Sequence, residues 1–278
     1  MNIVLFNQYA GSPDYGMEYR PYFLAKYWVR EGHNVTIVTS SFSHLRNKQP
    51  SMKNYKLYQE EFVDGIRYVW VRGNKYQGNG IGRFINILIY TCLSVFIGKT
   101  VRKCDLIITS STHPLDIFAA IRLRNRFSDA KLIFEPHDLW PMVLYEIGGM
   151  STMHPLVILM QFAEDLSCKN ADAVVSMHPY NIDHLETRGC NRTDFYHIPN
   201  GVDIETFDNS CECPINVVER IQCLRAEGKK IVVAAATCAR SLLKQNIDFT
   251  LVNVQIHFVR IIHPENSRAQ FGPINEIV

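Results

Sequence analysis

The chain has 278 residues, of which 47% are hydrophobic and 20% are charged, a composition typical of one large globular α/β domain or two small ones. Its 29 basic and 27 acidic residues give a formal net charge of +2 and are spread along the chain, which argues against a nucleic-acid partner. The eight cysteines form no CxxC pair and have no histidine nearby at ligand spacing, so we expect reduced thiols and no zinc site.

The N-terminus begins directly with an apolar strand, without a basic segment or a cleavage site, so we predict no secretory signal and a cytoplasmic protein. Apolar stretches of strand length then alternate with segments of helical period. This alternation is typical of βαβ units that build a doubly wound parallel sheet. The predicted strands are nearly continuous apolar runs and span residues 3–7, 34–39, 105–109, 131–135, 173–176 and 195–198.

The first predicted helix has an apolar stripe from Pro21 to Val29 and ends before Gly32. Further helices are predicted at residues 82–103, 115–126, 155–170 and 179–188. Within the helix predicted at 82–103, residues 84–98 are nearly all apolar but shorter than the roughly twenty residues that span a bilayer. Four residues give it a less apolar face: Arg83, Asn86, Tyr90 and Ser94. This favours a buried helix, with contact at a membrane surface as the alternative.

Asp64-Gly65 between two β-rich runs, 56–63 and 66–71, predicts a tight hairpin at a sheet edge. The polar segment 43–54 has no apolar period and predicts a mobile loop. Pro199-Asn200-Gly201 suits a crossover between domains.

We therefore predict a first domain at residues 1–200 and a second at 201–278, with a helix at 214–228 and strands at 230–236 and 248–254. The segment from residue 263 has no period and is expected to be unstructured. About seventy residues are too few for a second complete doubly wound domain.

The first candidate site is the loop at residues 8–17, which follows the first strand, where open α/β sheets bind ligands. Gly11 and Gly16 would let backbone amides approach a phosphate, and Arg20 would add a bidentate contact. A simple structural turn is the alternative. Because the G-x-G-x-x-G fingerprint is absent, a nicotinamide enzyme is disfavoured.

The second candidate site, E-P-H-D-L-W-P at residues 135–141, also follows a strand. His137 would titrate or donate to a sugar hydroxyl, Asp138 would fix its tautomer, and Trp140 would offer a flat apolar face. A structural histidine and a core tryptophan are the alternative. After another strand, the hydroxyls of residues 110–112 are expected to cap the next helix, with a place in the cleft as the alternative.

Five segments in order resemble the group 1, family 4 type glycosyltransferases of the GT-B fold, nearest to the WbuB-like branch that builds O-antigen, capsule or colanic-acid repeat units. They are N-Q-Y-A-G-S-P-D-Y-G-M-E-Y-R-P-Y-F-L-A-K, S-F-S-H-L-R-N-K-Q-P, E-P-H-D-L-W-P, A-D-A-V-V-S-M and I-P-N-G-V-D. The resemblance covers residues 1–207. It implies two Rossmann-like domains facing across a cleft, the first on the acceptor side.

The implied reaction transfers a sugar from a nucleoside diphosphate sugar to a hydroxyl of a lipid-linked glycan, with retention and without a metal or other cofactor. By the resemblance His137 is the catalytic residue near the transferred sugar. The substrate-binding set expected from the motifs is Gly11, Gly16, Glu18, Arg20, Asp138 and Trp140.

The sequence departs from the family after residue 207. Glu219 and Glu227 have the family's Glu-x7-Glu spacing, but they precede the expected strand, so we interpret the pair as coincidence. Residues 201–278 resemble a truncated remnant of the donor-binding domain. The predicted function is surface-polysaccharide glycosyltransferase in the cytoplasm, with the inner membrane face as a further location. The alternatives are a non-catalytic acceptor-binding partner subunit and an inactive remnant.

Overall fold

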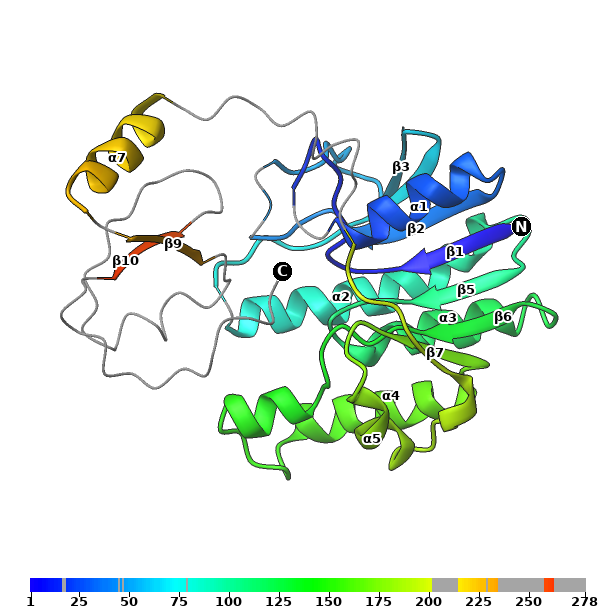
Figure 1. The fold of residues 1–278 in the computed structure, drawn as a ribbon. Helices are drawn as coiled ribbons and strands as arrows, with labels where there is room; N and C mark the ends of the chain where they lie inside the picture. Colours follow the sequence, from blue (N-terminus) through cyan, green and yellow to red (C-terminus); the bar gives the residue numbers. More distant parts are fainter. Residues whose placement is uncertain are drawn as a thin grey trace. The chain divides into compact units, whose positions relative to one another are not determined.

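The computed structural model describes residues 1–16, 19–44, 46, 48–78, 80–201, 215–228, 230–234 and 258–262 of the chain. The chain divides into two compact units, Met1–Asp203 and Ile204–Val278. The first unit carries an eight-stranded sheet with its helices, and the described residues of the second form a two-stranded sheet and one helix (Figure 1).

The sheet of the first unit has the strand order β3-β4-β2-β1-β5-β6-β7-β8. Neighbouring strands are parallel except β3 and β4, which form an antiparallel hairpin at one edge. The strands are β1 (Asn2–Phe6), β2 (Asn34–Ser40), β3 (Tyr58–Val63), β4 (Ile66–Val71), β5 (Leu106–Thr109), β6 (Lys131–Phe134), β7 (Ala173–Ser176) and β8 (Phe195–His197). The predicted doubly wound, Rossmann-like sheet is confirmed.

The helices that cover this sheet are α1 (Arg20–Arg30), α2 (Ile81–Ile97), α3 (Ile117–Arg124), α4 (Pro155–Asn170) and α5 (Asn181–Glu186). Short 3-10 turns occur at η1 (Gly98–Thr100), η2 (Pro114–Asp116) and η4 (Arg192–Asp194), and a π-helical turn that the sequence pattern did not predict occurs at η3 (Val143–Ile147).

The central strand β1 contributes to a hydrophobic core on each face of the sheet. Ile3 and Leu5 belong to one cluster with residues of α1, whereas Val4 and Phe6 belong to a second cluster with residues of α2, α3 and α4. Because successive side chains of a strand point to opposite faces, a continuous apolar run is what such a strand requires. Figure 1 shows β1 between β2 and β5 in the middle of the sheet.

The hairpin turn between β3 and β4 has the predicted conformation. Asp64 and Gly65 have φ values of 50° and 78°, the left-handed pair that a tight two-residue turn needs. A Cβ added at Gly65 would lie 2.9 Å from Cγ1 of Val29 in α1. The turn is therefore held by backbone conformation and also by close contact with a helix.

We expect Gly65→Ala to lower the free energy of unfolding by about 1–3 kcal/mol, because the left-handed conformation and the contact with Val29 both oppose a Cβ. Gly32→Ala is the matched control, because Gly32 has a φ of 82° with no atom within 4 Å of an added Cβ. In urea unfolding the Gly65 variant should lose about 1 kcal/mol more than the Gly32 variant. Equal losses would show that the contact with Val29 is unimportant.

Helix α2 buries its less apolar face. Asn86 and Tyr90 are fully buried and Ser94 is 1% exposed. Within the described ranges, Ile81–Thr100 is the stretch that is long and apolar enough to cross a membrane, with a mean hydropathy of 1.7 and 39% of it buried.

Three described residues of the segment predicted as a mobile loop are buried, Ser43, Arg46 and Pro50. The Arg46 guanidinium donates to the carbonyl oxygens of Ser40 at 2.6 Å and Ala10 at 2.9 Å and lies 5.0 Å from the ring centroid of Trp70. Burial lowers the pKa of Arg46 to about 10. The prediction of a mobile polar loop is therefore wrong at Arg46, because its guanidinium is bound to backbone carbonyls inside the fold.

The described part of the second unit consists of α7 (Ile215–Ala226) and the antiparallel pair β9 (Lys230–Ala234) and β10 (Phe258–Ile262). Helix α7 and β9 match the predictions for residues 214–228 and 230–236. Strand β10 was not predicted. The strand predicted at residues 248–254 and the segment from residue 263 lie outside the described residues.

Candidate functional site

The candidate site lies at the carboxyl ends of the parallel strands. Along the chain, β2 is added on one side of β1 and β5 on the other, so the loops after β1 and β5 diverge at a topological switch point, where α/β sheets bind ligands. Side-chain hydrogen bonds join these loops. The Asn7 side chain donates to the carbonyl of Ser110 at 2.5 Å, and the Gln8 amide donates to Oγ of Ser111 at 2.8 Å.

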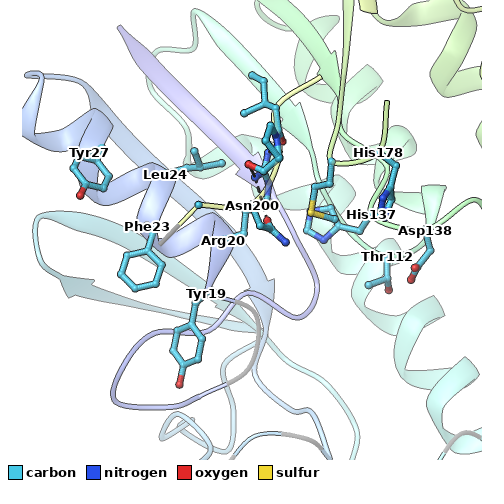
Figure 2. A pocket seen from close by; sticks show the side chains of 14 residues that line it. Tyr19, Arg20, Phe23, Leu24, Tyr27, Thr112, His137, Asp138, His178 and Asn200 are labelled. Carbon is cyan, nitrogen blue, oxygen red and sulfur yellow. Dashed lines mark hydrogen bonds between the residues drawn. The ribbon is translucent and has the colours of Figure 1, made fainter. Parts of the chain in front are cut away.

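A cavity of about 760 Å³, here named the His137 cavity, opens beside these loops. Figure 2 shows His137, Asp138, Thr112 and His178 on one side of it and the side chains of α1 on the other. The lining residues are Tyr19, Arg20, Phe23, Leu24, Tyr27, Thr112, His137, Asp138, Met177, His178, Ile198, Pro199, Asn200 and Gly201. The loops after β5, β6, β7 and β8 and the helix after β1 thus converge on one cavity.

Two buried groups, the Ser110 hydroxyl and the Glu135 carboxylate, orient the His137 imidazole. Its Nε2 lies 2.9 Å from Oγ of Ser110 and 3.8 Å from Oε2 of Glu135. The Ser110 hydroxyl donates to the same Glu135 oxygen at 2.6 Å. Since Glu135 and His137 are 4% and 9% exposed, the imidazole is held in one orientation at the cavity wall.

Arg20 compensates the Glu135 carboxylate and binds the crossover after β8. Its Nε and Nη2 donate to Oε1 of Glu135 at 3.0 and 2.8 Å. Its remaining donors bind the carbonyl oxygens of Ile198 and Pro199, each at 3.0 Å, and Oδ1 of Asn200 at 3.2 Å. All five N–H donors of the guanidinium are engaged within the chain. The expected phosphate contact of Arg20 stays a prediction, and it would require some of these bonds to be exchanged.

Glu135 is ionised at neutral pH in this environment. Burial alone would raise the pKa of its carboxyl group, but the hydrogen bond and charge of His137, the charge of Arg20 and the hydrogen bond of Ser110 together lower it below the ordinary value of 4.5. A buried carboxylate requires such compensation.

The structure gathers some of the predicted site residues and separates others. Arg20, His137 and Asp138 line the His137 cavity, whereas Gly11 and Gly16 lie in the buried loop after β1 and are not among its lining residues. Gly16 has a φ of 82°, in the left-handed region that favours glycine over other residues.

Trp140, a further predicted residue, is not among the residues that line the cavity. Trp140 packs against the core beside α3 and α4, in agreement with the alternative of a core tryptophan. Glu18 lies outside the described residues. Contact between these residues and a substrate stays a prediction.

Ser110, Ser111 and Thr112 do not cap the next helix. No side-chain cap is formed at either the η2 turn or α3, and the three hydroxyl residues instead bind Glu135, bind Gln8 and line the cavity. The favoured helix-cap interpretation was therefore wrong. Sequence reasoning also missed that Glu135 contacts the imidazole. Strands β5 and β6 are neighbours in the sheet, so the loops that follow them lie side by side. That both motifs directly follow predicted strands was the sequence signal that could have indicated this contact.

His113 belongs to a buried polar network next to the site. Its Nε2 makes a hydrogen bond with Oε1 of Gln8, and the Gln8 amide nitrogen donates to Oδ1 of Asn86 at 2.8 Å. Burial, followed by the charge of Arg83, lowers the pKa of His113 to about 3. The imidazole is therefore neutral. Among the described residues no group of three or more His, Cys, Asp or Glu side chains is arranged to hold a metal ion.

We expect Arg20→Met to lower the free energy of unfolding by about 3–5 kcal/mol, because it leaves a buried carboxylate without its cation. The matched control is Arg67→Met. Arg67 makes a similar pair with Glu60, at 2.7 Å, where the carboxylate side chain is 38% exposed. Exposed pairs contribute about 1 kcal/mol or less. Urea unfolding at neutral pH measures both, and similar losses in the two variants would contradict the assignment.

His113 predicts a pH dependence of stability. Because its folded-state pKa lies below the ordinary value of 6.5, its contribution is complete above that pH and is lost as the pH falls toward the folded value. Between pH 7 and pH 5 the loss should be about 2 kcal/mol. Urea unfolding of the wild type and of His113→Gln at both pH values isolates the pH-dependent contribution of His113 to the free energy of unfolding. A constant difference between the two proteins would contradict it.

The family model described as Glycosyltransferase Family 4 matches residues 15–206. This match includes α1, β2 to β8 and the His137 cavity. The chain belongs to this glycosyltransferase family, and this resemblance supports a transferase. A search of curated protein sequences found no match.

Solved structures with a similar fold include the following three. The E. coli trehalose-6-phosphate structure bound with UDP-2-fluoro glucose is 10% identical, with a TM-score of 0.54, over 81% of this chain and 55% of that one. Sucrose-phosphate synthase of Thermosynechococcus elongatus is 14% identical, with a TM-score of 0.44, over 81% and 98%. Anabaena HepE in complex with UDP-glucose is 15% identical, with a TM-score of 0.44, over 81% and 50%. The chain thus spans about half the length of two of these proteins.

Proposed function

We propose that this chain transfers a sugar from a nucleoside diphosphate sugar to a hydroxyl group of a lipid-linked glycan, with retention at the anomeric carbon. The observation that carries the proposal is the orientation of His137, which Ser110 and Glu135 hold at the wall of a cavity built from strand ends. The biosynthesis of a surface polysaccharide of the O-antigen, capsule or colanic-acid type is the proposed setting, as the WbuB-like resemblance implies.

In the proposed reaction the bond between the anomeric carbon and the diphosphate oxygen breaks and a bond to the acceptor oxygen forms. The acceptor's proton leaves with the diphosphate. Because the transition state resembles an oxocarbenium ion, the protein mainly needs to orient the two reactants and stabilise charge. Fixing an imidazole at the cavity wall serves that requirement, since its orientation is established before substrate binds. We propose that no metal ion or other cofactor takes part.

Asp138 and Thr112 would bind hydroxyl groups of the sugar or acceptor, because both line the cavity beside His137. Tyr19, Phe23 and Tyr27 form an aromatic stripe along α1 on the other side, a surface suited to the apolar face of a sugar ring. The proposed location is the cytoplasm, at the inner face of the membrane that holds the acceptor.

The test mixes the purified chain with a panel of nucleotide sugars and a short-chain lipid-linked acceptor and measures released nucleoside diphosphate. UDP-glucose is the first donor to examine, because the E. coli protein with the same fold binds UDP-2-fluoro glucose. We expect His137→Ala to lower the rate about 100-fold or more. His154→Ala is the control, because His154 is an exposed residue that precedes α4.

Chelation by EDTA should leave the rate unchanged. Absence of release with every donor, together with no binding of nucleoside diphosphate in calorimetry, would contradict the enzymatic proposal. Activity that appears only after a second, donor-binding chain is added would support the non-catalytic partner subunit instead.

A further inference from the structure

Helix α2 buries several polar residues against the sheet layer and exposes large apolar residues to solvent. Its polar residues face the protein, where Asn86, Tyr90 and Ser94 are at most 1% exposed and Thr91 is 8% exposed. A surface helix of a globular protein normally directs an apolar stripe inward and polar residues outward. Helix α2 packs apolar residues such as Ile87 and Ile97 inward as well, but its outward side carries large apolar side chains where polar ones are expected.

Specific hydrogen bonds fix the helix in this orientation. Asn86 accepts from Gln8 at 2.8 Å and donates to the carbonyl of Asn74 at 2.8 Å. The Tyr90 hydroxyl donates to the carbonyl of Val38 at 3.0 Å. These partners belong to β2 and to the loops after β1 and β4, so α2 cannot rotate without breaking buried hydrogen bonds. The outward apolar side is therefore a fixed feature of the fold.

The exposed apolar residues lie on one face of α2. Ile81, Ile85 and Phe96 are 79%, 44% and 60% exposed and recur at i, i+4 and i+15, a spacing that places them on the same side of a helix. The surface continues onto the hairpin. Leu57 and Tyr58, which are 61% and 36% exposed, line an apolar hollow of about 280 Å³ together with the C-terminal half of α2.

Basic residues surround this apolar surface. Lys99 lines the same hollow, its ammonium 5.9 Å from the ring centroid of Phe96, and Arg102 and Lys103 are exposed just beyond it. Lys53 and Lys56 are exposed next to Leu57 and Tyr58.

The two carboxylates nearby are already engaged. Glu60 pairs with Arg67 at 2.7 Å, and Asp105 accepts from the backbone amide of Asn2 at 2.6 Å. The charge of the surface is therefore positive.

We propose that this face, the α2 surface, binds the surface of a membrane that contains anionic phospholipids. It comprises the apolar residues Leu57, Tyr58, Ile81, Ile85 and Phe96 and the basic residues Lys53, Lys56, Lys99, Arg102 and Lys103. Apolar side chains enter the boundary between headgroups and acyl chains, and lysine and arginine side chains bind the anionic headgroups. A second copy of this face would meet it with like charge, which disfavours self-association. The helix lies on the membrane rather than across it, because its inner side is bonded to the sheet layer.

A role for this membrane binding rests on the proposed function, because a lipid-linked acceptor lies in a membrane. Membrane binding itself is measured independently of sugar transfer. The intact chain is floated with vesicles of phosphatidylglycerol and phosphatidylcholine in equal parts and with vesicles of phosphatidylcholine alone. We expect binding to the anionic vesicles that is at least about tenfold stronger and that weakens at about 0.5 M salt. Ile85→Asp with Phe96→Asp, and separately Lys99→Glu with Arg102→Glu and Lys103→Glu, should each lower binding about tenfold or more.

The matched control is Ile158→Asp with Phe162→Asp in α4, where the two side chains are 51% and 56% exposed. This variant should bind like the wild type, and so should His137→Ala, which affects only the proposed transfer reaction. Circular dichroism establishes that each variant is folded.

Three results would overturn the proposal. The first is equal binding to both kinds of vesicle, and the second is wild-type binding by the α2 variants. The third is a wild-type dimer that Phe96→Asp dissociates, without vesicle binding, which would assign the surface to a second copy of the chain. Loss of nucleoside diphosphate release with vesicle binding intact would instead contradict the proposed function alone.

Discussion

The site depends on one buried carboxylate. Glu135 directly follows β6 in the interior of the fold, where an unpaired charge would cost several kcal/mol. Its two oxygens accept hydrogen bonds from Arg20 on one side and Ser110 on the other. These partners come from the helix after β1 and the loop after β5. Three chain segments that are distant in sequence are therefore held together by the need to neutralise one charge, and His137 takes its orientation from that cluster.

The sheet topology makes this arrangement possible. Because β1 pairs with both β2 and β5, the chain leaves β1 at the switch point, and its next helix begins beside the loops after β5 and β6. The same crossing brings Gln8 next to His113 and Asn86 in a network without charge. A charged cluster and a neutral one thus lie side by side at the carboxyl edge. The first carries the residue proposed for catalysis, and the second fixes α2 against the sheet.

Local patterns were sufficient to predict much of the fold. Strand β7 and helix α4 have the predicted bounds, and Asp64-Gly65 makes the predicted turn, since each depends on residues close together in the sequence. The contacts that define the site are non-local and were predicted less well. His137 and Arg20 were identified as site residues, but their partners, Ser110 and Glu135, follow only from the order of the strands. The burial of Arg46 likewise depends on carbonyls of Ala10 and Ser40 that no local pattern brings near it.

The way Arg20 binds the crossover has a consequence for how this cavity can diversify. Arg20 contacts Ile198 and Pro199 through their backbone carbonyl oxygens, while both residues line the cavity wall. Every amino acid supplies the same carbonyl, so the side chains at these positions can be exchanged without removing the bonds that hold the segment. The wall of the cavity can therefore be reshaped for another substrate, by evolution or by engineering, while its attachment to Glu135 and the sheet is retained.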